Sequence, residues 1–528
     1  MVEGPRRIVG TRKILYKDEY LESGYEAKDR NNLEVSFDYL LHKGEARDEY
    51  TITGYIFVPP ELKINKATYS KQTFFHDFQS SIRFQTPHFP LRSVVNNENG
   101  LSPLNRIKKI LDEMAGGKFD DEDLNARLVY ELKMHAQIVR SNLKNEIAVI
   151  IEMCSNKGSC SPENVIETTQ PLVGIINQIQ DRFHSFQATF NSLQLPQKTK
   201  ETYFAADEYV SYYIEHYATV LLDKIKNDAC YDLIIPDIRA LIIRRQQRRK
   251  NMNYTLVLDP DVTDATKNSK NTKVHYWKSF LKHFIKQVLV LETKEREERK
   301  LLMQVIGTAG AITAMSVFVI FTFFFFGFGQ YSLPFVLATL IFYAIKDRIK
   351  VLFLALGERI TNKMIPDKVY DIVDSLKKKE KIGTVKESVQ FIKLDKVPDE
   401  VIQMRNNDRA SVIEMESSEE NVLLYRKHIQ LDTGRITHLH ERHKNITDAL
   451  KINIKNFLSY AWDPEENILY FNAATGRLEE IPVPIRYHIN MVLSQSYTDS
   501  KNVEKTRYKR IRVVFEKDGI DNVEDIPV

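Results

Sequence analysis

The sequence predicts an α+β membrane protein built from an N-terminal β-hairpin, a bundle of long helices, a two-pass transmembrane hairpin and a C-terminal, β-rich, sandwich-like domain. Three observations predict this fold class. Residues 301–345 contain no charged side chain and are long enough for two membrane passes. Residues 101–300 repeat apolar side chains at helical spacing, whereas both ends of the chain alternate apolar and polar side chains as strands do. The 528 residues are enough for about three folded units.

The chain divides into five segments. We expect residues 1–100 to form a β-hairpin with a short helix, and residues 101–300 to form an antiparallel helical bundle. Residues 301–345 then form the transmembrane helical hairpin, residues 346–380 amphipathic helices next to the membrane, and residues 381–528 a β-rich cytoplasmic domain. The first segment either joins the last in one β domain or covers the helical bundle.

Two strands are predicted at 33–41 and 50–58, and the polar sequence HKGEARDE between them is typical of a hairpin turn. Two strands alone are only marginally stable in water, because they cannot bury an apolar face. We therefore predict that this pair packs on strands from the region 385–515.

A short helix is predicted after Ser70, whose hydroxyl can cap it. The helix carries an aromatic stripe at helical spacing, made of Phe74, Phe75, Phe78 and Ile82. Such a stripe is either core or the wall of a pocket with His76 and Asp77 at its rim, and the core interpretation is the more common.

Long helices fill the second segment. An acidic first turn and an apolar face predict a helix that ends near residue 147. Ser161 and Pro162 begin a second helix, which ends before Pro196, and a tyrosine-rich third helix covers 201–226. A last helix is expected to run from 275 to 300 and to continue into the membrane. Long helices joined by short turns favour an antiparallel bundle.

One concentrated basic run lies in this bundle and consists of Arg244, Arg245, Arg248, Arg249 and Lys250. Clusters of this kind near a membrane bind anionic headgroups at about 1 kcal/mol per charge. The alternative is a solvated helix end whose cations complement the helix dipole. The net charge of +4 is small for this length and gives no support to a nucleic-acid partner.

The uncharged stretch is interpreted as two passes separated near Gly327, Gly329 and Pro334. The first pass, 301–328, holds fifteen Leu, Ile, Val or Phe residues, which favour insertion by roughly 5–9 kcal/mol. The second pass, 328–345, holds nine such residues and is expected to insert by packing against the first. Two pairs of small residues, Gly307 with Ala311 and Gly310 with Ala314, allow close approach to the second pass or to another copy.

Basic residues flank both ends of the hairpin, and the turn carries none. Before it lie Lys294, Arg296, Arg299 and Lys300, and after it Lys346, Arg348 and Lys350. The positive-inside rule therefore places both termini in the cytoplasm, with the last three residues as candidates for contact with headgroups. The N-terminal sequence has no apolar segment typical of a cleaved signal peptide. The segment after residue 345 is expected either to lie on the inner membrane surface or to pack on a soluble domain.

The C-terminal part alternates strands and turns. Strands are predicted at 385–394, 422–431, 468–472, 487–493 and 508–515. Residues 446–460 are predicted to form a helix. We expect a sandwich or a small barrel.

One candidate metal site lies in the sequence THLHERHKN, which contains His438, His440 and His443 with Glu441. Imidazole and carboxylate are suitable zinc ligands, but the spacing does not place three of them on one helical face. A polar loop without metal explains the same residues. No P-loop, nucleophile elbow or dinucleotide fingerprint occurs in the sequence, so no catalytic residue and no cofactor is predicted.

The chain resembles a group of uncharacterised bacterial inner-membrane proteins with a central transmembrane hairpin. The resemblance rests on IFVPPEL at 56–62, TYSKQTFFHDFQSSIRFQTP at 68–87, the hairpin itself and YAIKDRIK at 343–350. It implies a location in a bacterial inner membrane and brings no known activity.

Three classes of function remain open. The first is a membrane-anchored, cytoplasm-facing scaffold or sensor that binds a protein partner or the membrane surface. The second is an oligomeric pore-forming or membrane-remodelling protein, in which hairpins of several copies associate. The third is an enzyme with an unrecognised site in the β-rich domain. The lipid bilayer and a protein partner or a second copy are the expected partners.

Overall fold

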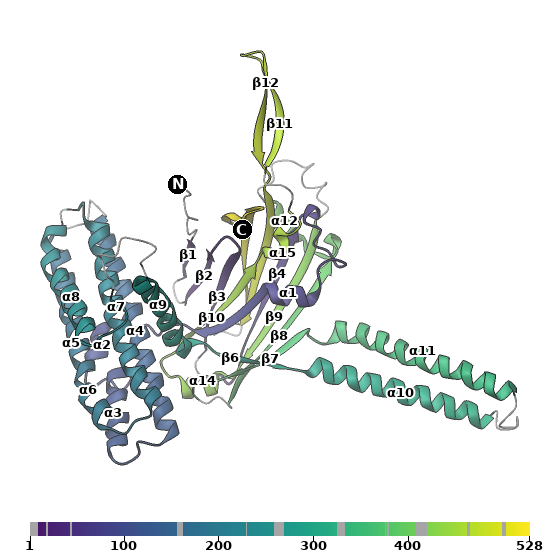
Figure 1. Ribbon diagram of the computed structural model, residues 1–528, viewed down its shortest axis with the longest axis horizontal. Coiled ribbons are helices and arrows are strands. Elements are labelled where there is room, and N and C mark those ends of the chain that lie inside the picture. Colours follow the sequence, from purple (N-terminus) through teal and green to yellow (C-terminus); the bar gives the residue numbers. More distant parts are fainter. Residues whose placement is uncertain are drawn as a thin grey trace.

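The molecule has four visibly separate parts: a helical bundle, a β-sheet body, a long helical hairpin and a narrow two-stranded arm (Figure 1). The computed structural model describes residues 9–16, 19–42, 45–155, 162–228, 230–257, 269–324, 333–374, 376, 380–407, 420–461, 465–498 and 503–527. The body lies between the bundle and the hairpin, and the arm projects from the body in another direction (Figure 1). The fold is mixed α+β with a large β-sheet domain, as the sequence predicts.

Two antiparallel sheets form the body. The smaller has the order β1 (Val9–Tyr16), β2 (Glu19–Ala27), β3 (Asn32–Leu40), β10 (Asn445–Asn453) and β5 (Phe78–Phe84). The larger has the order β15 (Gly519–Ile526), β14 (Glu504–Glu516), β13 (Tyr487–Thr498), β4 (Asp48–Val58), β9 (Asn421–Leu431), β8 (Lys381–Ile392), β7 (Lys368–Val373) and β6 (Glu292–Arg296). Both sheets therefore combine strands from the two ends of the chain.

The two sheets pack face to face through aromatic and charged side chains. Tyr39 of β3 stacks on Tyr50 of β4 with ring centroids 4.5 Å apart. The buried ammonium of Lys427 on β9 donates to the Asp448 carboxylate of β10 at 2.6 Å. Such a buried pair is stable only when its geometry is good, so it fixes how the sheets face each other.

The pairing of β4 with β13 and β9 confirms that the terminal β regions share one domain. The predicted hairpin between 33–41 and 50–58 is wrong, because β3 and β4 lie in different sheets. The predicted helix at 446–460 is also wrong, since β10 occupies most of it and supplies the partner of β3. This strand is buried on both faces, which hides the alternation expected of a strand.

The short helix α1 (Lys71–Asp77) begins as predicted, with the Ser70 hydroxyl accepting from the backbone N–H of Thr73 at 3.1 Å. It ends at Asp77, and the second half of the predicted helix is strand β5. Phe74, Phe78 and Ile82 are buried, so the aromatic stripe is core. His76 points to solvent, and Asp77 accepts from Tyr69 at 2.7 Å.

Helices make up the bundle and its connections. The main ones are α3 (Pro103–Ala115), α4 (Glu122–Ser155), α5 (Pro162–Ser185), α7 (Gln197–Ile225), α8 (Tyr231–Asn251) and α9 (Ser269–Lys286). Shorter ones are α2 (Leu91–Val95), α6 (Gln187–Ser192) and, in the body, α12 (Asp399–Asn406), α14 (Thr433–Leu439) and α15 (Lys455–Leu458). The described part of the chain also contains the short 3₁₀ helices η1 (Pro60–Leu62), η2 (Gln287–Leu289) and η3 (Leu394–Lys396).

The path from the bundle into the hairpin differs from the prediction. The helix expected over 275–300 ends at Lys286, and the chain then passes through η2 and the edge strand β6 before α10 (Glu298–Phe324) begins. After the turn, α11 (Leu333–Met364) is one helix, so the second pass and the separate helix expected after 345 are continuous. The strand β7 follows, where juxtamembrane helices up to 380 were expected. Hairpin and body therefore meet at a sheet edge.

Strands β11 (Glu465–Asn472) and β12 (Arg477–Pro484) form the arm, which makes a two-stranded sheet of its own. Its turn carries Gly476 in the left-handed region, with φ of 68°. All but one of its sixteen strand residues are exposed. The arm therefore lacks the covering layer that a two-stranded sheet needs in water.

Candidate functional site

The helical hairpin α10–α11 is the region most unlike the rest of the protein, and it is the candidate site. It leaves and rejoins the body through two neighbouring strands, because Arg296 at the end of β6 pairs with Val369 of β7. Asp371 of β7 holds this edge together, accepting from Arg296 at 2.6 Å and pairing with Lys381 at 2.7 Å. Both ends of the hairpin therefore lie at one face of the body.

Small residues set the contact between the two helices. A Cβ atom added at Gly310 would lie 2.8 Å from the Cβ of Phe353, and one added at Gly357 would lie 2.6 Å from the Cγ2 of Ile306. Gly307 faces Leu354, and Ala314 is 1% exposed. Three of the four small residues singled out in the sequence therefore face α11, whereas Ala311 is exposed.

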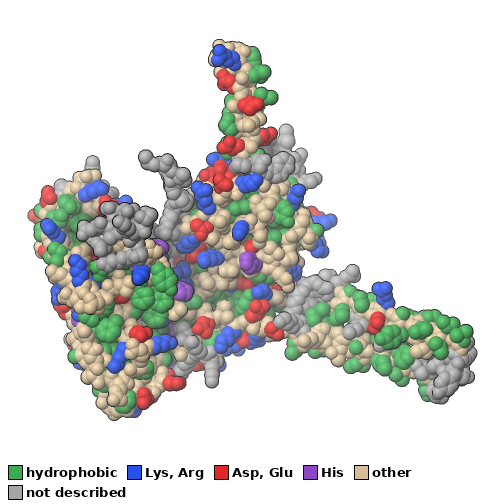
Figure 2. Space-filling model, in the orientation of Figure 1, with side chains coloured by type: hydrophobic (Ala, Val, Ile, Leu, Met, Phe, Trp, Pro, Cys, Tyr) green, Lys and Arg blue, Asp and Glu red, His purple; other side chains and the backbone are tan. Residues whose placement is uncertain are grey.

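Apolar side chains cover much of the described outer surface of the hairpin (Figure 2). More than half of the side-chain surface is exposed at Leu301, Val305, Ile312, Val319, Ile320, Phe323, Phe324, Leu333, Leu337, Leu340 and Ile341. Monomeric soluble proteins rarely expose so large a continuous apolar surface to water. An apolar environment is therefore expected around the hairpin.

The hydroxyl groups on α10 are satisfied within the helix. Thr308, Thr313 and Ser316 each donate to the backbone carbonyl four residues earlier, at 2.9 Å in all three cases. Hydrocarbon offers no hydrogen-bond partner, so internal bonds of this kind let a hydroxyl enter it at reduced cost.

The two helices differ in their fitness to cross a bilayer. Among the described residues one helical window is long and apolar enough, Leu301–Ile320 of α10, and only 11% of it is buried. In α11 the uncharged part, 333–345, is followed by Lys346, Asp347, Arg348 and Lys350 within the same helix. The uncharged part of α11 among the described residues is therefore 13 residues long, whereas a complete crossing needs about 20. The second pass remains a prediction from the sequence.

The histidine segment, 438–443, has another role from the one considered in the sequence analysis. His440 and His443 are buried, and Tyr130 of α4 lies between them, with its hydroxyl 3.0 Å from His440 Nδ1 and 3.1 Å from His443 Nε2. His440 Nε2 contacts the buried carboxylate of Asp374, and His443 Nδ1 lies 3.2 Å from the Gln85 carbonyl.

Counting protons defines the state of this chain. The Asp374 carboxylate and the Gln85 carbonyl at its two ends can only accept, and four hydrogen bonds connect them. Each neutral imidazole brings one N–H, and the Tyr130 hydroxyl brings one O–H. Burial, followed by the charges of His440 and Arg442, lowers the pKa of His443 well below its ordinary value, which leaves His443 neutral. His443 therefore donates through Nδ1 to the Gln85 carbonyl and accepts through Nε2 from the Tyr130 hydroxyl.

A second contact beside the histidines joins the body to the bundle. Arg442 donates to Glu131 of α4 at 2.5 Å, and both side chains are buried. Arg106 of α3 donates to Glu441 at 2.7 Å. His438 does not join this cluster, and no group of three His, Cys, Asp or Glu side chains suited to a metal occurs in the described ranges. The segment docks the bundle on the sheets.

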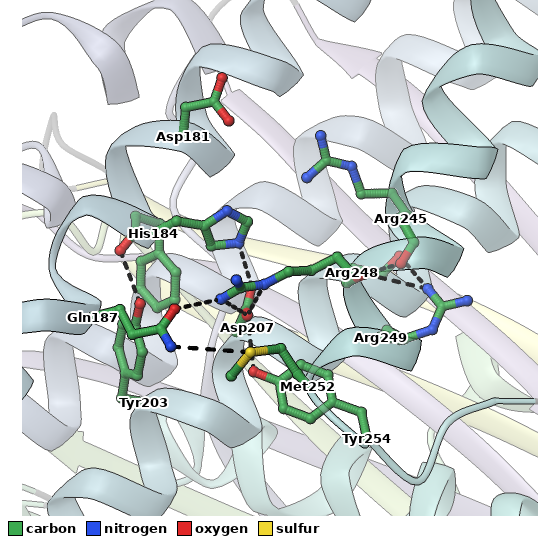
Figure 3. Close-up of polar contacts among 12 residues, drawn as sticks. Asp181, His184, Gln187, Tyr203, Asp207, Arg245, Arg248, Arg249, Met252 and Tyr254 are labelled. Atoms are coloured by element: carbon green, nitrogen blue, oxygen red, sulfur yellow. Dashed lines mark hydrogen bonds and ion pairs between the residues drawn. The ribbon is translucent and has the colours of Figure 1, made fainter. Parts of the chain in front are cut away.

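Three residues of the basic run of α8 are largely buried, and Figure 3 shows one of them, Arg248, reaching Asp207. Arg245 and Arg249 are 1% and 4% exposed, and Arg248 donates through Nε and Nη2 to Asp207 of α7 at 3.2 and 3.1 Å. The predicted contact with headgroups is therefore wrong for these three residues, whose charges have protein partners. Arg244, paired with Asp181 at 2.5 Å, and Lys250 remain at the surface.

Asp207 is the centre of this network and is fully buried (Figure 3). Its carboxylate also accepts from His184 at 2.8 Å and from Tyr254 at 2.9 Å. Burial alone would raise the pKa of Asp207, but the hydrogen bond and charge of His184, with the charge of Arg248, hold it below the ordinary value. Burial lowers the pKa of Arg245 and of Arg249 to about 10, so both stay charged at neutral pH.

Sequence reasoning missed Asp207, Tyr130 and Asp374. The partners of each lie far away along the chain. The acidic residues at 207 and 208 on an otherwise aromatic helix face were a usable signal, because a buried carboxylate needs a cation and the basic run was the nearest source.

No family model, no curated protein and no solved structure matches this chain. The resemblance to bacterial inner-membrane proteins therefore stays a prediction from the sequence.

Proposed function

We propose that the protein is a membrane-anchored scaffold whose hairpin α10–α11 lies in a lipid bilayer and holds the bundle and the β-sheet body at the cytoplasmic face. The observation that carries this proposal is the exposed apolar surface of the hairpin, which extends away from the body (Figure 1) and has no charged residue between Leu301 and Ile345. A lipid environment removes that surface from water.

The orientation follows from the connection of the hairpin to the body. Because β6 and β7 are neighbours, the chain returns to the face it left. Basic residues flank both ends of the uncharged stretch, and the positive-inside rule assigns that face to the cytoplasm. The sequence hypothesis of two complete passes is one form of such an anchor.

The arm β11–β12 supports the scaffold role. It exposes apolar side chains on both of its faces. Leu469, Phe471 and Leu478 lie on one face, with exposed fractions of 68%, 59% and 73%, and the other face carries Ile468, Tyr470 and Ile481. Glu479 and Glu480 of β12, with Glu465 and Glu466 of β11, make it acidic. A two-stranded arm of this kind needs a covering partner. We infer that a protein with a complementary apolar and basic surface binds it.

Replacement of the hairpin tests the anchor. Residues 298–366 are exchanged for a short Gly-Ser link, which the pairing of Arg296 with Val369 allows without displacing β6 or β7. The intact protein is expected to float with lipid vesicles in a density gradient, and the variant is expected to stay with the soluble fraction. Its thermal unfolding should match that of the intact body.

Replacement of the arm is the matched control. Glu465 pairs with Pro484, so a short link can close residues 465–484 in the same way. This variant is expected to float with vesicles as the intact protein does, while losing any protein that co-purifies. An intact chain that fails to float, or a hairpin-replaced chain that floats equally well, overturns the proposed anchor.

A further inference from the structure

We propose that the hairpin enters a single leaflet of the bilayer, with its tip near the bilayer centre and the charged residues 346–350 at the headgroups. The inference rests on the proposed anchor and adds the depth to which it inserts. It replaces two complete passes with an insertion that starts and ends in the same leaflet.

The contacts between the helices fix which residues share a level along the hairpin. Gly310 lies against Phe353, and Gly357 lies against Ile306. The two helices are antiparallel, and each residue advances about 1.5 Å along its helix axis. The next residue toward the tip on α10 is therefore level with the preceding residue in the sequence of α11. Thr313 is therefore level with Lys350, and Val317 with Lys346.

These levels, Thr313 with Lys350 and Val317 with Lys346, are incompatible with a bilayer crossing by the apolar segment Leu301–Ile320 of α10. If Leu301–Ile320 spanned the hydrocarbon, the residues of α10 at the level of the charges would lie in the far half of the bilayer. Lys346, Asp347, Arg348 and Lys350 would then be immersed beside them. Asp347 and Arg348 are exposed on the outside of the hairpin, where lipid would surround them.

The uncharged tip has the length of one leaflet with its interface. From Leu333 to Ile345 the helix α11 rises about 20 Å, whereas a complete hydrocarbon core is about 30 Å thick. The same level on α10 begins at about Val317. Described side chains of this tip, such as Phe323, Phe324 and Leu333, are the most exposed apolar groups of the hairpin, at 79%, 79% and 73%.

The half of the hairpin nearer the body is more polar. On α10 it carries Gln304, Thr308 and Thr313, and on α11 it carries the charges at 346–350 followed by Glu358, Arg359 and Lys363. Lys and Arg side chains at such a level extend their charged ends to the headgroups while their stems stay in apolar surroundings. The polarity of the hairpin thus increases from tip to base.

Depth-dependent quenching tests the insertion in the full chain reconstituted in phosphatidylcholine–phosphatidylglycerol vesicles. Cys160→Ser removes one native thiol, and Cys154 and Cys230 are buried. A fluorophore is attached at Thr313→Cys, Phe324→Cys or Leu333→Cys, with the parent chain as labelling control. Each sample is measured with lipids brominated near the headgroup and with lipids brominated near the acyl-chain end.

The proposal expects the strongest quenching by deep bromines at positions 324 and 333, and the strongest quenching by shallow bromines at position 313. Two complete passes predict the reverse order, with the deepest label near 313 and the tip in the far headgroup region, and that result overturns the inference. Absence of quenching at all three positions overturns the proposed anchor itself, so the two failures are distinguishable.

Removal of the charges gives a second measurement. The variant K346L/D347L/R348L/K350L is expected to insert further, which lowers the ratio of deep to shallow quenching at position 333. The matched variant R359L/K363L changes charges at the base and should leave this ratio unchanged. An unchanged ratio in the first variant contradicts the role of the charged residues in limiting the depth.

Discussion

The helical bundle and the helical hairpin are both made of long antiparallel helices, yet they distribute polarity in opposite ways. The bundle buries charged groups such as Asp207, Arg245 and Arg249 among apolar side chains and pairs each with a partner. The hairpin exposes Phe323, Phe324 and other apolar side chains. This difference is what the proposed function explains, with water around the bundle and lipid around the hairpin.

The comparison also shows that local charge is a weak guide to the membrane surface. The densest basic run of the sequence lies in the bundle and is used for internal ion pairs. On α11, by contrast, the described charged side chains, Asp347 and Arg348, are exposed. Whether a charged side chain is buried or exposed therefore depends on the partners that folding brings to it.

The largest effect on the bundle is expected from Asp207→Leu. It leaves Arg248 and His184 without their shared carboxylate, and breaking a buried pair typically costs about 3–5 kcal/mol. The free energy of unfolding of the detergent-solubilised chain, followed by circular dichroism and by the fluorescence of Trp277, should fall by this amount. Vesicle flotation should be unchanged.

Asp181→Asn is the matched control, because its pair with Arg244 is about half exposed on both sides. Exposed pairs contribute about 0–1 kcal/mol. Equal losses for the two variants would show that burial of charge does not distinguish the bundle from its surface.

The pH dependence of stability is expected to distinguish the bundle from the hairpin. Burial, opposed by the charge of Asp207, lowers the pKa of His135 in the bundle from 6.5 to about 3, and neither of its ring nitrogens has a hydrogen-bond partner among the described residues. The unfolded chain binds a proton below pH 6.5 that the folded chain does not, so stability falls as pH falls from 6.5 toward 3, by up to about 1.4 kcal/mol per pH unit.

His135→Phe should flatten this dependence and keep the stacking on Phe183, whose ring centroid lies 4.7 Å away. Vesicle binding should be less sensitive to pH, since the tip of the hairpin holds no acidic residue, histidine, lysine or arginine. A variant with the same acid sensitivity as the parent would exclude His135 as its source.

A smaller loss of stability toward unfolding is expected from Tyr130→Phe, which removes the hydroxyl between His440 and His443. Two buried nitrogens then lose a partner, at about 1–3 kcal/mol. Thermal unfolding of the intact chain measures it. Tyr276→Phe serves as control, because this side chain is 68% exposed.

The smallest effect is expected from Gly310→Leu, which forces α10 away from Phe353. Overpacking of this kind costs on the order of 1–3 kcal/mol, and partial opening of an exposed hairpin relieves part of it. The distance between spin labels at Thr308 and Leu356 should increase. Ala309→Leu, on the exposed side of the same helix, should leave the distance unchanged.

The sequence was a good guide wherever the signal was local. The Ser70 cap, the start of α5 at Pro162 and the apolar stretch of α10 each depend on neighbouring residues, and the structure contains them. The joint β domain was also predictable, because exposed apolar strands need a third partner.

The predictions that the structure contradicts failed where contacts between residues distant in the sequence decide the fold. Residues 446–460 contain good helix formers, but β10 lies between β3 and β5 and is buried on both faces. The arginines of α8 have their acidic partners on α7. The histidines at 440 and 443 have partners on α4 and at Gln85, just after β5. No local pattern contains these pairings, since they form only when the chain folds.

The central claim is that the hairpin tip contacts lipid while the bundle surface contacts water, and vesicle flotation of two matched variants tests it most directly. Phe324→Asp with Leu333→Asp places two charges on the tip, and Leu233→Asp with Ile243→Asp places two on exposed positions of α8. The account predicts that the tip variant leaves the vesicle fraction and that the α8 variant floats as the parent does. A tip variant that floats like the parent would contradict it.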